Sequence, residues 1–232
     1  MEQMMSNRLN TRLVKVLGAT PAHRCMSFDP IWEAVAEHYF DAVPIYPLQL
    51  MAVLSRIEEG ARILDVGCGP ARQAEHLVKL RCSYVGIDMS ESMLRIAVTQ
   101  TSSDKVKFVR GDATLLPFLD NSFDWSMMLN NTLGIIPSWQ RRQDAIAEMV
   151  RVSRNGVMFE VLYGDKPFEV ESQLFRDKYG QTPPYKSARF THNYFIEIGK
   201  NLELNTQINF VRDSTNYSHY FLATFTGRKS SA

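Results

Sequence analysis

The feature that most constrains this chain is the stretch ARILDVGCGPARQ at residues 61–73. A short apolar run ends there in Gly67-Cys68-Gly69, and a helical pattern follows. A buried strand that breaks into a glycine turn and then opens a helix is a common way to hold a nucleotide-like ligand, because glycine lets the backbone approach closely. The stretch therefore predicts the first strand–turn–helix unit of a nucleotide-binding α/β sheet.

Three further segments follow at spacings that fit repeated strand–helix–strand units. In VGIDMS, residues 85–90, Asp88 stands at the end of an apolar run, where an acidic residue can accept hydrogen bonds from ribose hydroxyls. The other two segments are strands that end in polar residues, namely VKFVRGDATLLPF with Gly111-Asp112-Ala113 and NSFDWSMMLNNTLG with Asn130-Asn131. Their order predicts that polar groups collect at the ends of neighbouring strands.

The segments LDVGCG, VGID, GDATLLPF and NSFDWSMM together resemble the class I S-adenosylmethionine-dependent methyltransferases, over residues 50–165 and more loosely to the C-terminus. The resemblance implies S-adenosylmethionine as cofactor and S-adenosylhomocysteine as product. It also implies roles near the methionine part for Asp65, Gly67, Cys68 and Gly69. Asp88 would bind the ribose and Met89 would lie beside the adenine. Asp112 would contact the adenine amino group with Ala113 against the ring, and Leu129 and Asn130 would lie near the sulfonium.

One position departs from the family pattern D-x-G-x-G-x-G. Ala71 stands where the third glycine is usual, and alanine still permits close packing of helix on strand. The wider pattern G-x-G-x-x-G is also absent, because position 72 is Arg72. The pyrophosphate of a nicotinamide or flavin dinucleotide uses that wider turn, so the sequence argues against such a cofactor.

Length and charge set the class of protein. A chain of 232 residues fits one domain with a lid, and a net charge of +1 provides no overall field to attract nucleic acid or an anionic membrane. No apolar stretch approaches the ~18 residues of a membrane-spanning helix. Cys25, Cys68 and Cys82 show no C-x-x-C spacing, which predicts a reducing compartment, a cytoplasmic location and no metal site.

The periodicity predicts an α/β fold with a seven-stranded, mostly parallel, doubly wound sheet of the Rossmann-like methyltransferase type. The predicted strands are 62–66, 84–88, 106–110, 123–129, 157–162 (after a turn at Arg154-Asn155-Gly156), 203–212 and 217–227. The predicted helices are 30–40, 47–57, 70–81, one capped by Ser90, 139–152 and one from Thr191 to 200. No helix-length spacer separates the last two strands, so they should form an antiparallel C-terminal hairpin.

Residues 1–50 are predicted as an N-terminal helical lid on a cofactor-binding domain of residues 51–232, with residues 164–190 as a substrate cap. Residues 1–26 carry four basic residues and one acid, with apolar residues near one helical face. This pattern is typical of an amphipathic helix that covers a site, and a mitochondrial targeting peptide also shows it. Both interpretations stay open.

Mechanism follows from the implied cofactor, whose sulfonium methyl is transferred by in-line displacement to an N, O or C atom. A hydroxyl or carbon nucleophile usually needs a base, and the sequence shows no convincing one. Candidate residues for binding a small-molecule acceptor are Tyr39, Tyr46, Asn131 and His192. The identity of the acceptor, the atom methylated and the oligomeric state stay open.

Three rival functions can be formulated. An RNA or protein methyltransferase would need a basic face, which the balanced charge does not suggest. The segment Thr182-Pro183-Pro184-Tyr185 resembles the N-P-P-Y signature of nucleic-acid amino-methyltransferases, but that signature belongs at the end of the fourth strand and this segment follows the fifth. Nucleic acid is therefore not expected as a partner. A catalytically silent S-adenosylmethionine-binding protein or subunit would keep the same cofactor residues. A Rossmann dehydrogenase would leave Asp112 without a role.

Overall fold

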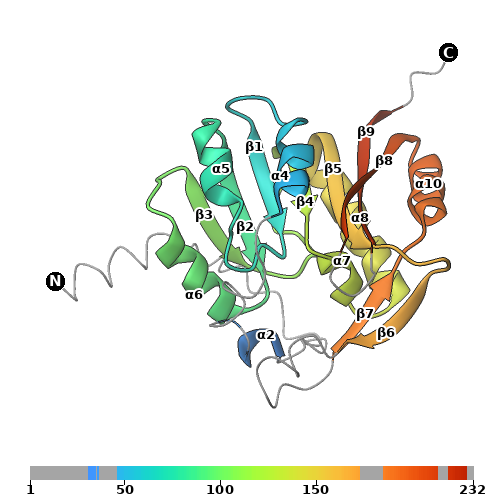
Figure 1. Ribbon diagram of the computed structural model, residues 1–232. Coiled ribbons are helices and arrows are strands. Elements are labelled where there is room, and N and C mark those ends of the chain that lie inside the picture. Colours follow the sequence, from blue (N-terminus) through green and yellow to red (C-terminus); the bar gives the residue numbers. More distant parts are fainter. Residues whose placement is uncertain (1–30, 35, 37–45, 173–184, 214–218, 229–232) are drawn as a thin grey trace.

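A computed structural model describes residues 31–34, 36, 46–172, 185–213 and 219–228, and within them one large sheet forms the centre of the molecule (Figure 1). The sheet has seven strands in the order β3-β2-β1-β4-β5-β9-β8. The strands are β1 (Arg62–Val66), β2 (Ser83–Asp88), β3 (Val106–Arg110), β4 (Phe123–Met128), β5 (Ser153–Leu162), β8 (Leu204–Asp213) and β9 (His219–Arg228). β1 to β5 are parallel, and β9 is antiparallel to β5 and β8. The predicted mostly parallel sheet with a C-terminal hairpin is confirmed.

Helices cover both faces of this sheet (Figure 1). They are α2 (Ile31–Ala34), α4 (Pro47–Leu54), α5 (Ala74–Lys79), α6 (Glu91–Gln100), α7 (Thr132–Ile135), α8 (Trp139–Val152) and α10 (His192–Asn201). The adjacent β1 residues Ile63 and Leu64 are both fully buried, yet they belong to different hydrophobic clusters. Alternate side chains of a strand point to opposite faces, so β1 is buried on both sides, as a central parallel strand requires.

Hydroxyl side chains fix the starts of two helices, α6 and α10, as the sequence predicts. The Ser90 Oγ accepts a hydrogen bond from the Met93 N–H at 3.1 Å, and the Thr191 Oγ1 accepts one from the Tyr194 N–H at 3.1 Å. Such caps satisfy amide groups that have no partner within the helix. The bounds of α8, residues 139–152, are also as predicted.

Two predicted boundaries are wrong, for local steric reasons. The helix predicted over residues 70–81 begins only at Ala74, because Ala71 has a φ of 55°, which is left-handed and cannot continue a right-handed helix. The turn predicted at residues 154–156 lies inside β5 instead. A Cβ on Gly156 would collide with the Phe225 carbonyl of β9, so this glycine permits close approach of two strands rather than a turn.

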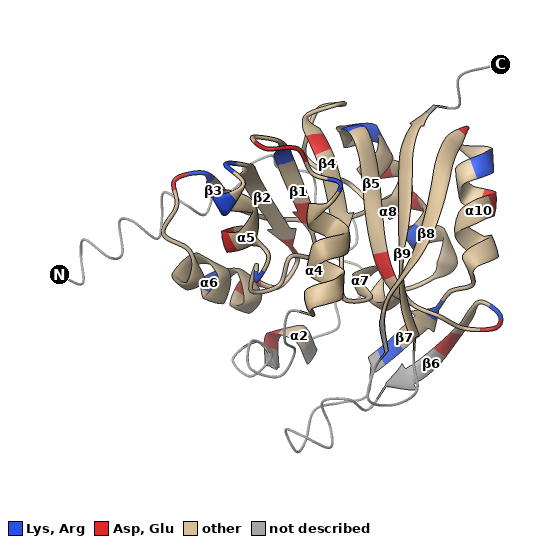
Figure 2. Cartoon of the chain, turned by 45° about the horizontal axis from the view of Figure 1, so that its top comes forward, with Lys and Arg blue, Asp and Glu red and all other residues tan. Residues whose placement is uncertain are grey.

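The predicted substrate cap contains a hairpin that the sequence analysis did not anticipate. β6 (Phe168–Ser172) and β7 (Tyr185–Arg189) form a separate two-stranded antiparallel sheet (Figure 2). It is attached to the end of β5 because the Phe190 N–H donates to the Leu162 carbonyl at 2.8 Å and the Gly164 N–H donates to the Phe190 carbonyl at 2.9 Å. The hairpin therefore extends from the β5 side of the large sheet.

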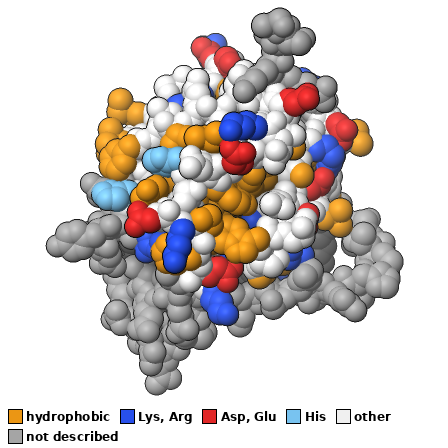
Figure 3. Space-filling view, turned by 90° about the vertical axis from the view of Figure 1, so that its right-hand side faces the viewer, with side chains coloured by type: hydrophobic (Ala, Val, Ile, Leu, Met, Phe, Trp, Pro, Cys, Tyr) orange, Lys and Arg blue, Asp and Glu red, His pale blue; other side chains and the backbone are white. Residues whose placement is uncertain are grey.

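The edge strand β8 is only partly covered. Its residues Leu204 and Ile208 pack against the cluster that includes Phe195 of α10. Phe210, further along the same strand, is 59% exposed, and its ring lies 6.3 Å from that of His219. Figure 3 shows hydrophobic side chains and histidines gathered on this side of the molecule.

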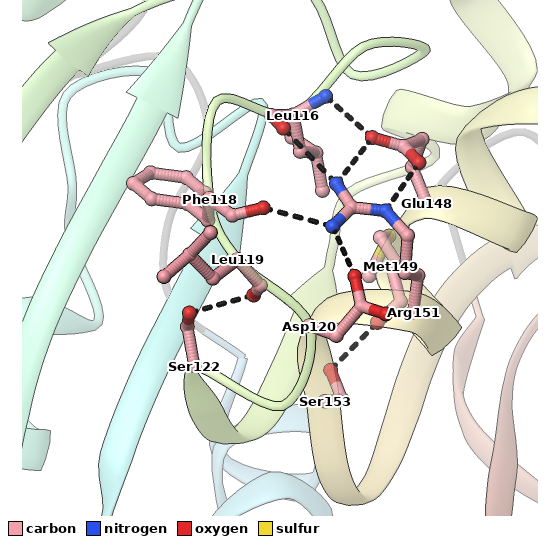
Figure 4. Close-up of polar contacts among 9 residues, drawn as sticks. All are labelled: Leu116, Phe118, Leu119, Asp120, Ser122, Glu148, Met149, Arg151 and Ser153. Atoms are coloured by element: carbon pink, nitrogen blue, oxygen red, sulfur yellow. Dashed lines mark hydrogen bonds and ion pairs between the residues drawn. The ribbon is translucent and has the colours of Figure 1, made fainter.

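The loop between β3 and β4 is fastened to α8 by Arg151 (Figure 4). The Arg151 guanidinium donates to the carbonyls of Leu116 and Phe118 at 3.1 and 2.8 Å, and to the carboxylates of Asp120 and Glu148. Glu148 in turn accepts from the Leu116 N–H at 2.8 Å. Charge-assisted hydrogen bonds of this kind are stronger than neutral ones, so one side chain orders the loop.

Substitution Arg151→Ala should lower the free energy of unfolding by about 1–2 kcal/mol, because two carbonyls lose their donor and Glu148 loses its cation. Urea denaturation followed by circular dichroism would measure this. The matched control is Arg95→Ala, since Arg95 also pairs with a glutamate but its side chain is 71% exposed. Its effect should be no more than about 0.5 kcal/mol. Equal effects of the two substitutions would contradict the proposed role of Arg151.

Candidate functional site

A cavity of about 790 Å³ lies where the parallel strands β1 to β4 end. In open α/β sheets, ligands bind in the crevice outside the carboxyl ends of the strands. Eight of the predicted cofactor residues line the cavity, namely Gly67, Cys68, Gly69, Asp88, Met89, Asp112, Ala113 and Asn130. The structure thus brings together four segments that are separate in the sequence.

The glycine turn after β1 is held by β2. The N–H groups of Gly67 and Cys68 donate to the Ile87 carbonyl at 2.8 and 3.2 Å, and the Gly69 N–H donates to the Asp88 Oδ2 at 2.8 Å. Gly67 has a φ of 68°, and a Cβ there would collide with the Thr132 side chain. Glycine at this position is therefore required by backbone conformation and by the segment after β4.

Asp88 lies between the glycine turn and the start of α6. Its Oδ1 accepts from the Ser90 N–H at 2.8 Å, while its Oδ2 accepts from Gly69. Burial raises the pKa of Asp88, although the hydrogen bonds from the Ser90 and Gly69 amides act in the opposite direction. The carboxylate is thus oriented by backbone donors and still borders the cavity.

Asp65 lies outside the cavity lining and is only 2% exposed. Its Oδ2 accepts a hydrogen bond from the Tyr84 hydroxyl of β2 at 2.6 Å, rather than from the glycine turn that follows β1. Burial raises the pKa of Asp65 to about 7, even though the Tyr84 hydrogen bond lowers it. This carboxyl group therefore links β1 to β2.

Asp112 is paired with a residue of α8 that the sequence analysis missed. Its Oδ1 accepts from the Thr114 N–H and Oγ1, both at 2.9 Å, and its Oδ2 lies 2.6 Å from the Arg141 Nη2. Burial raises the pKa of Asp112, but the hydrogen bonds from Thr114 and Arg141 outweigh it and the pKa is lowered. Asp112 is therefore a fixed anion at the cavity wall.

The segment after β4 passes through two left-handed residues, Asn130 and Asn131, with φ of 53° and 60°. Asparagine tolerates this conformation better than most residues. Asn130 lines the cavity, and its N–H donates to the buried Glu160 carboxylate at 2.6 Å. Gln49 of α4 donates to both Glu160 and the Asn130 Oδ1, so α4 helps to position Asn130. Leu129 is buried and does not line the cavity.

The residues expected to bind an acceptor are not gathered in the cavity. Asn131 is 4% exposed and outside the lining, where its side chain joins Ser187 of β7 and the Leu162 N–H of β5. His192 is exposed and packs its ring against Tyr163 and Phe221. Tyr46 precedes α4 and also lies outside the lining. Tyr39 falls outside the described residues.

Other residues border the cavity that the sequence analysis did not select. Trp32 of α2, Trp139 and Arg142 of α8, and Glu169 and Lys186 of the β6–β7 hairpin all belong to the lining. Arg142 is 1% exposed and follows the same helical stripe as Ala145, Ile146 and Met149. An arginine at an apolar position of a helix is the sequence signal that could have identified it.

In the described part of the chain, no group of three or more His, Cys, Asp and Glu side chains could hold a metal ion. None of the described helices is both long and apolar enough to cross a membrane.

Comparison with known proteins places these features in a family. A family model described as "Methyltransferase domain" matches residues 63–156. Demethylmenaquinone methyltransferase of Staphylococcus epidermidis is 32% identical over 132 residues, which is 55% of this chain and 53% of that protein. The same enzyme of Staphylococcus aureus (strain MRSA252) is 37% identical over 115 residues, 48% of this chain and 46% of that protein. The chain therefore spans about half the length of the curated relatives it matches.

Solved structures share the fold at low sequence identity. The CcbJ methyltransferase of Streptomyces caelestis has a TM-score of 0.68 and 14% identity, covering 86% of this chain and 98% of that one. The 1,6-didemethyltoxoflavin-N1-methyltransferase of Burkholderia thailandensis, solved with 1,6-didemethyltoxoflavin and S-adenosylhomocysteine, has a TM-score of 0.62 and 17% identity. That match covers 90% of this chain and 94% of the other.

The raised pKa of Asp65 predicts a specific dependence of stability on pH. Between the ordinary pKa of 3.8 and about 7, the folded protein keeps the Asp65 proton while the unfolded chain loses it. The contribution of Asp65 to stability is thus complete below the lower value and is lost as the pH rises to the upper one, at ~1.4 kcal/mol per pH unit. Asp65→Asn should remove this decline, so its stability relative to wild type rises from about pH 4 to about pH 8.

Urea denaturation across this pH range would test the prediction. Tyr84→Phe is the matched variant of opposite sign, because it removes a hydrogen bond that lowers the pKa of Asp65. In Tyr84→Phe, the decline in the free energy of unfolding with rising pH should extend to higher pH than in the wild type. Parallel curves for wild type and Asp65→Asn would show that Asp65 does not titrate in this way.

Proposed function

We propose that this chain is a class I S-adenosylmethionine-dependent methyltransferase that transfers the methyl group of S-adenosylmethionine to a small-molecule acceptor. The observation that carries the proposal is the cavity at the ends of β1 to β4, where the glycine turn, Asp88 and Asp112 meet. Its volume of about 790 Å³ lies within the range of small-molecule sites.

The residues present fit the cofactor. In the proposed arrangement, the turn of Gly67, Cys68 and Gly69 borders the methionine part, and the buried Asp65 links β1 to β2 just before the turn. Asp88 accepts hydrogen bonds from the ribose hydroxyls while its backbone donors hold it in place. The cofactor supplies an activated methyl group for in-line displacement.

The adenine would lie between Met89 and Ala113, both of which line the cavity. Asp112 would accept from the adenine amino group, with Arg141 keeping the carboxylate ionised and oriented. Asn130 would lie near the sulfonium, with Leu129 behind it. The part of these residues is to bind, orient and exclude water, which is the main contribution a protein makes to such a transfer.

Two observations support a small acceptor over RNA or protein. The net charge is +1, whereas proteins that bind nucleic acid usually carry a basic face. The Staphylococcus relatives are named for demethylmenaquinone, a small molecule. We place the acceptor beneath the β6–β7 hairpin. In this proposal, residues 164–190 are a substrate cap on the core domain of residues 51–232, and residues 1–50 are a lid.

The first test is calorimetric titration of the protein with S-adenosylmethionine and, separately, with S-adenosylhomocysteine. Both should bind. Asp88→Ala should weaken binding by about 1–3 kcal/mol, or about 5–150-fold, because two ribose hydroxyls would lose their acceptor. Asp88→Asn, which keeps the shape of the side chain, should also weaken it.

The matched control is Asp104→Ala, an exposed carboxylate in the turn before β3 and outside the cavity lining, which should bind as the wild type does. Thermal unfolding of each variant checks that the fold is intact. Folded wild-type protein that binds neither ligand would refute the proposed function. Binding without methyl transfer to any acceptor would instead favour a silent cofactor-binding protein.

A further inference from the structure

The cavity contains one carboxylate whose hydrogen bonding is incomplete. Of the acids in the described lining, Asp88 and Asp112 each have both oxygens engaged by protein donors. Glu169 of β6 differs, because its Oε1 lies 2.8 Å from the Arg142 Nη2 and its other oxygen accepts no hydrogen bond from the described residues. The Glu169 side chain is 34% exposed. It is therefore available to a ligand in the cavity.

Arg142 holds Glu169 in a fixed place. The guanidinium is 1% exposed, donates to the carbonyls of Leu133 and Gly134 at 3.3 and 3.2 Å, and lies 4.5 Å from the centre of the Trp139 ring. These contacts fasten one guanidinium to both α7 and α8. Because α7 directly follows Asn130 and Asn131, Glu169 is tied to the segment expected beside the sulfonium.

The hairpin also presents a cation beside Glu169. In the β6–β7 register, Glu169 pairs with Ala188 and residue 171 pairs with Lys186. Glu169 and Lys186 are therefore diagonal neighbours on one face of the hairpin, and both line the cavity. A carboxylate oxygen without a donor can accept a proton from a bound group, and a neighbouring cation such as Lys186 can stabilise the negative charge that develops on that group.

Glu169 also lies on the side of the cavity away from the predicted adenine site. The β6–β7 hairpin is on the β5 side of the sheet, whereas α2 and α6 are on the side of β2 and β3 (Figures 1 and 2). Asp88 and Met89 stand at the end of β2, next to α6. This separation assigns Glu169 to the acceptor rather than to the cofactor.

We propose that Glu169 is the general base of the reaction and that Arg142 is its positioning residue, an inference that rests on the proposed methyltransferase function. The acceptor's O–H or N–H bond breaks and its proton passes to the free carboxylate oxygen of Glu169. The lone pair of the acceptor forms the new bond to the methyl carbon, and the S–CH₃ bond breaks with its electron pair going to sulfur. Glu169 then releases the proton to solvent.

The proposal identifies the class of acceptor. The nucleophile should carry a removable proton, as a phenol, an enol, a hydroquinone or a heterocyclic N–H does. An amine that is already neutral, or an aromatic nitrogen without a proton, needs no base and gains nothing from Glu169.

The test compares wild type with Glu169→Gln, using 1,4-naphthohydroquinone kept under anaerobic conditions and catechol as acceptors. Formation of S-adenosylhomocysteine reports methyl transfer, and calorimetric titration of S-adenosylhomocysteine-loaded protein with catechol reports acceptor binding. For the acceptors that react, kcat should fall about 10²–10⁴-fold in Glu169→Gln, the usual contribution of a general base. Binding of S-adenosylmethionine should be unchanged.

Three comparisons separate a base from a structural residue. Replacing catechol by 4-nitrocatechol, which is more readily ionised, should reduce the defect of Glu169→Gln, because an ionised acceptor no longer needs a base. The control Asp165→Asn, an exposed carboxylate in the loop before β6 and outside the lining, should behave as wild type. Glu169→Asp should recover part of the lost rate.

The role of Arg142 has its own test. Arg142→Lys keeps the positive charge but loses the planar arrangement of donors, so kcat should fall while the KM for S-adenosylmethionine stays constant. The defect should again be smaller with 4-nitrocatechol. If Arg142 had only a structural role, Arg142→Lys would lower kcat with catechol and kcat with 4-nitrocatechol by the same factor.

The outcomes distinguish this inference from the function on which it rests. If S-adenosylmethionine does not bind to the wild type, the proposed function fails first. If it binds but Glu169→Gln transfers methyl groups at the wild-type rate, the proposal for Glu169 is wrong. Failure of every one of these acceptors with protein that binds the cofactor would also overturn it.

Discussion

Three arginines of α8 hold together the segments that surround the cavity. Arg141 pairs with Asp112 after β3, Arg142 pairs with Glu169 of β6, and Arg151 fastens the loop between β3 and β4. Each guanidinium is a permanent charge with donors in a rigid plane, so it fixes its partners in direction as well as distance. One helix therefore sets the relation between the predicted adenine side and the hairpin.

The two ends of the cavity are built by different means. On the β2 side, backbone amides of the glycine turn and of the start of α6 orient Asp88. The position of this carboxylate therefore depends on the backbone at the strand ends. On the hairpin side, side-chain ion pairs orient Glu169 across elements that are far apart in the sequence. A scaffold with a fixed cofactor half and a separately attached cap is how an α/β fold serves many acceptors.

Local patterns account for the parts of the prediction that are confirmed. The apolar runs and the caps Ser90 and Thr191 identify strands and helices correctly because they depend on near neighbours in the chain. The predictions that are wrong concern Gly156 and the start of α5, where a distant strand or a left-handed residue decides the conformation. Asn131 and His192, which the sequence predicts to bind the acceptor, are polar residues near strand or helix ends. Packing directs their side chains to other partners.

By itself, the sequence determined the order of the seven strands of the large sheet along the chain, the glycine turn, and the acidic residues at the ends of β2 and β3, because these depend on spacing along the chain. Only the tertiary structure decided that Asp65 pairs with Tyr84, that Arg142 is buried, and that Glu169 enters the cavity with one oxygen free. The physical reason is that a charge is neutralised by whatever partner the fold brings near it. Glu169 and Arg142 are 27 residues apart, and no local pattern links them.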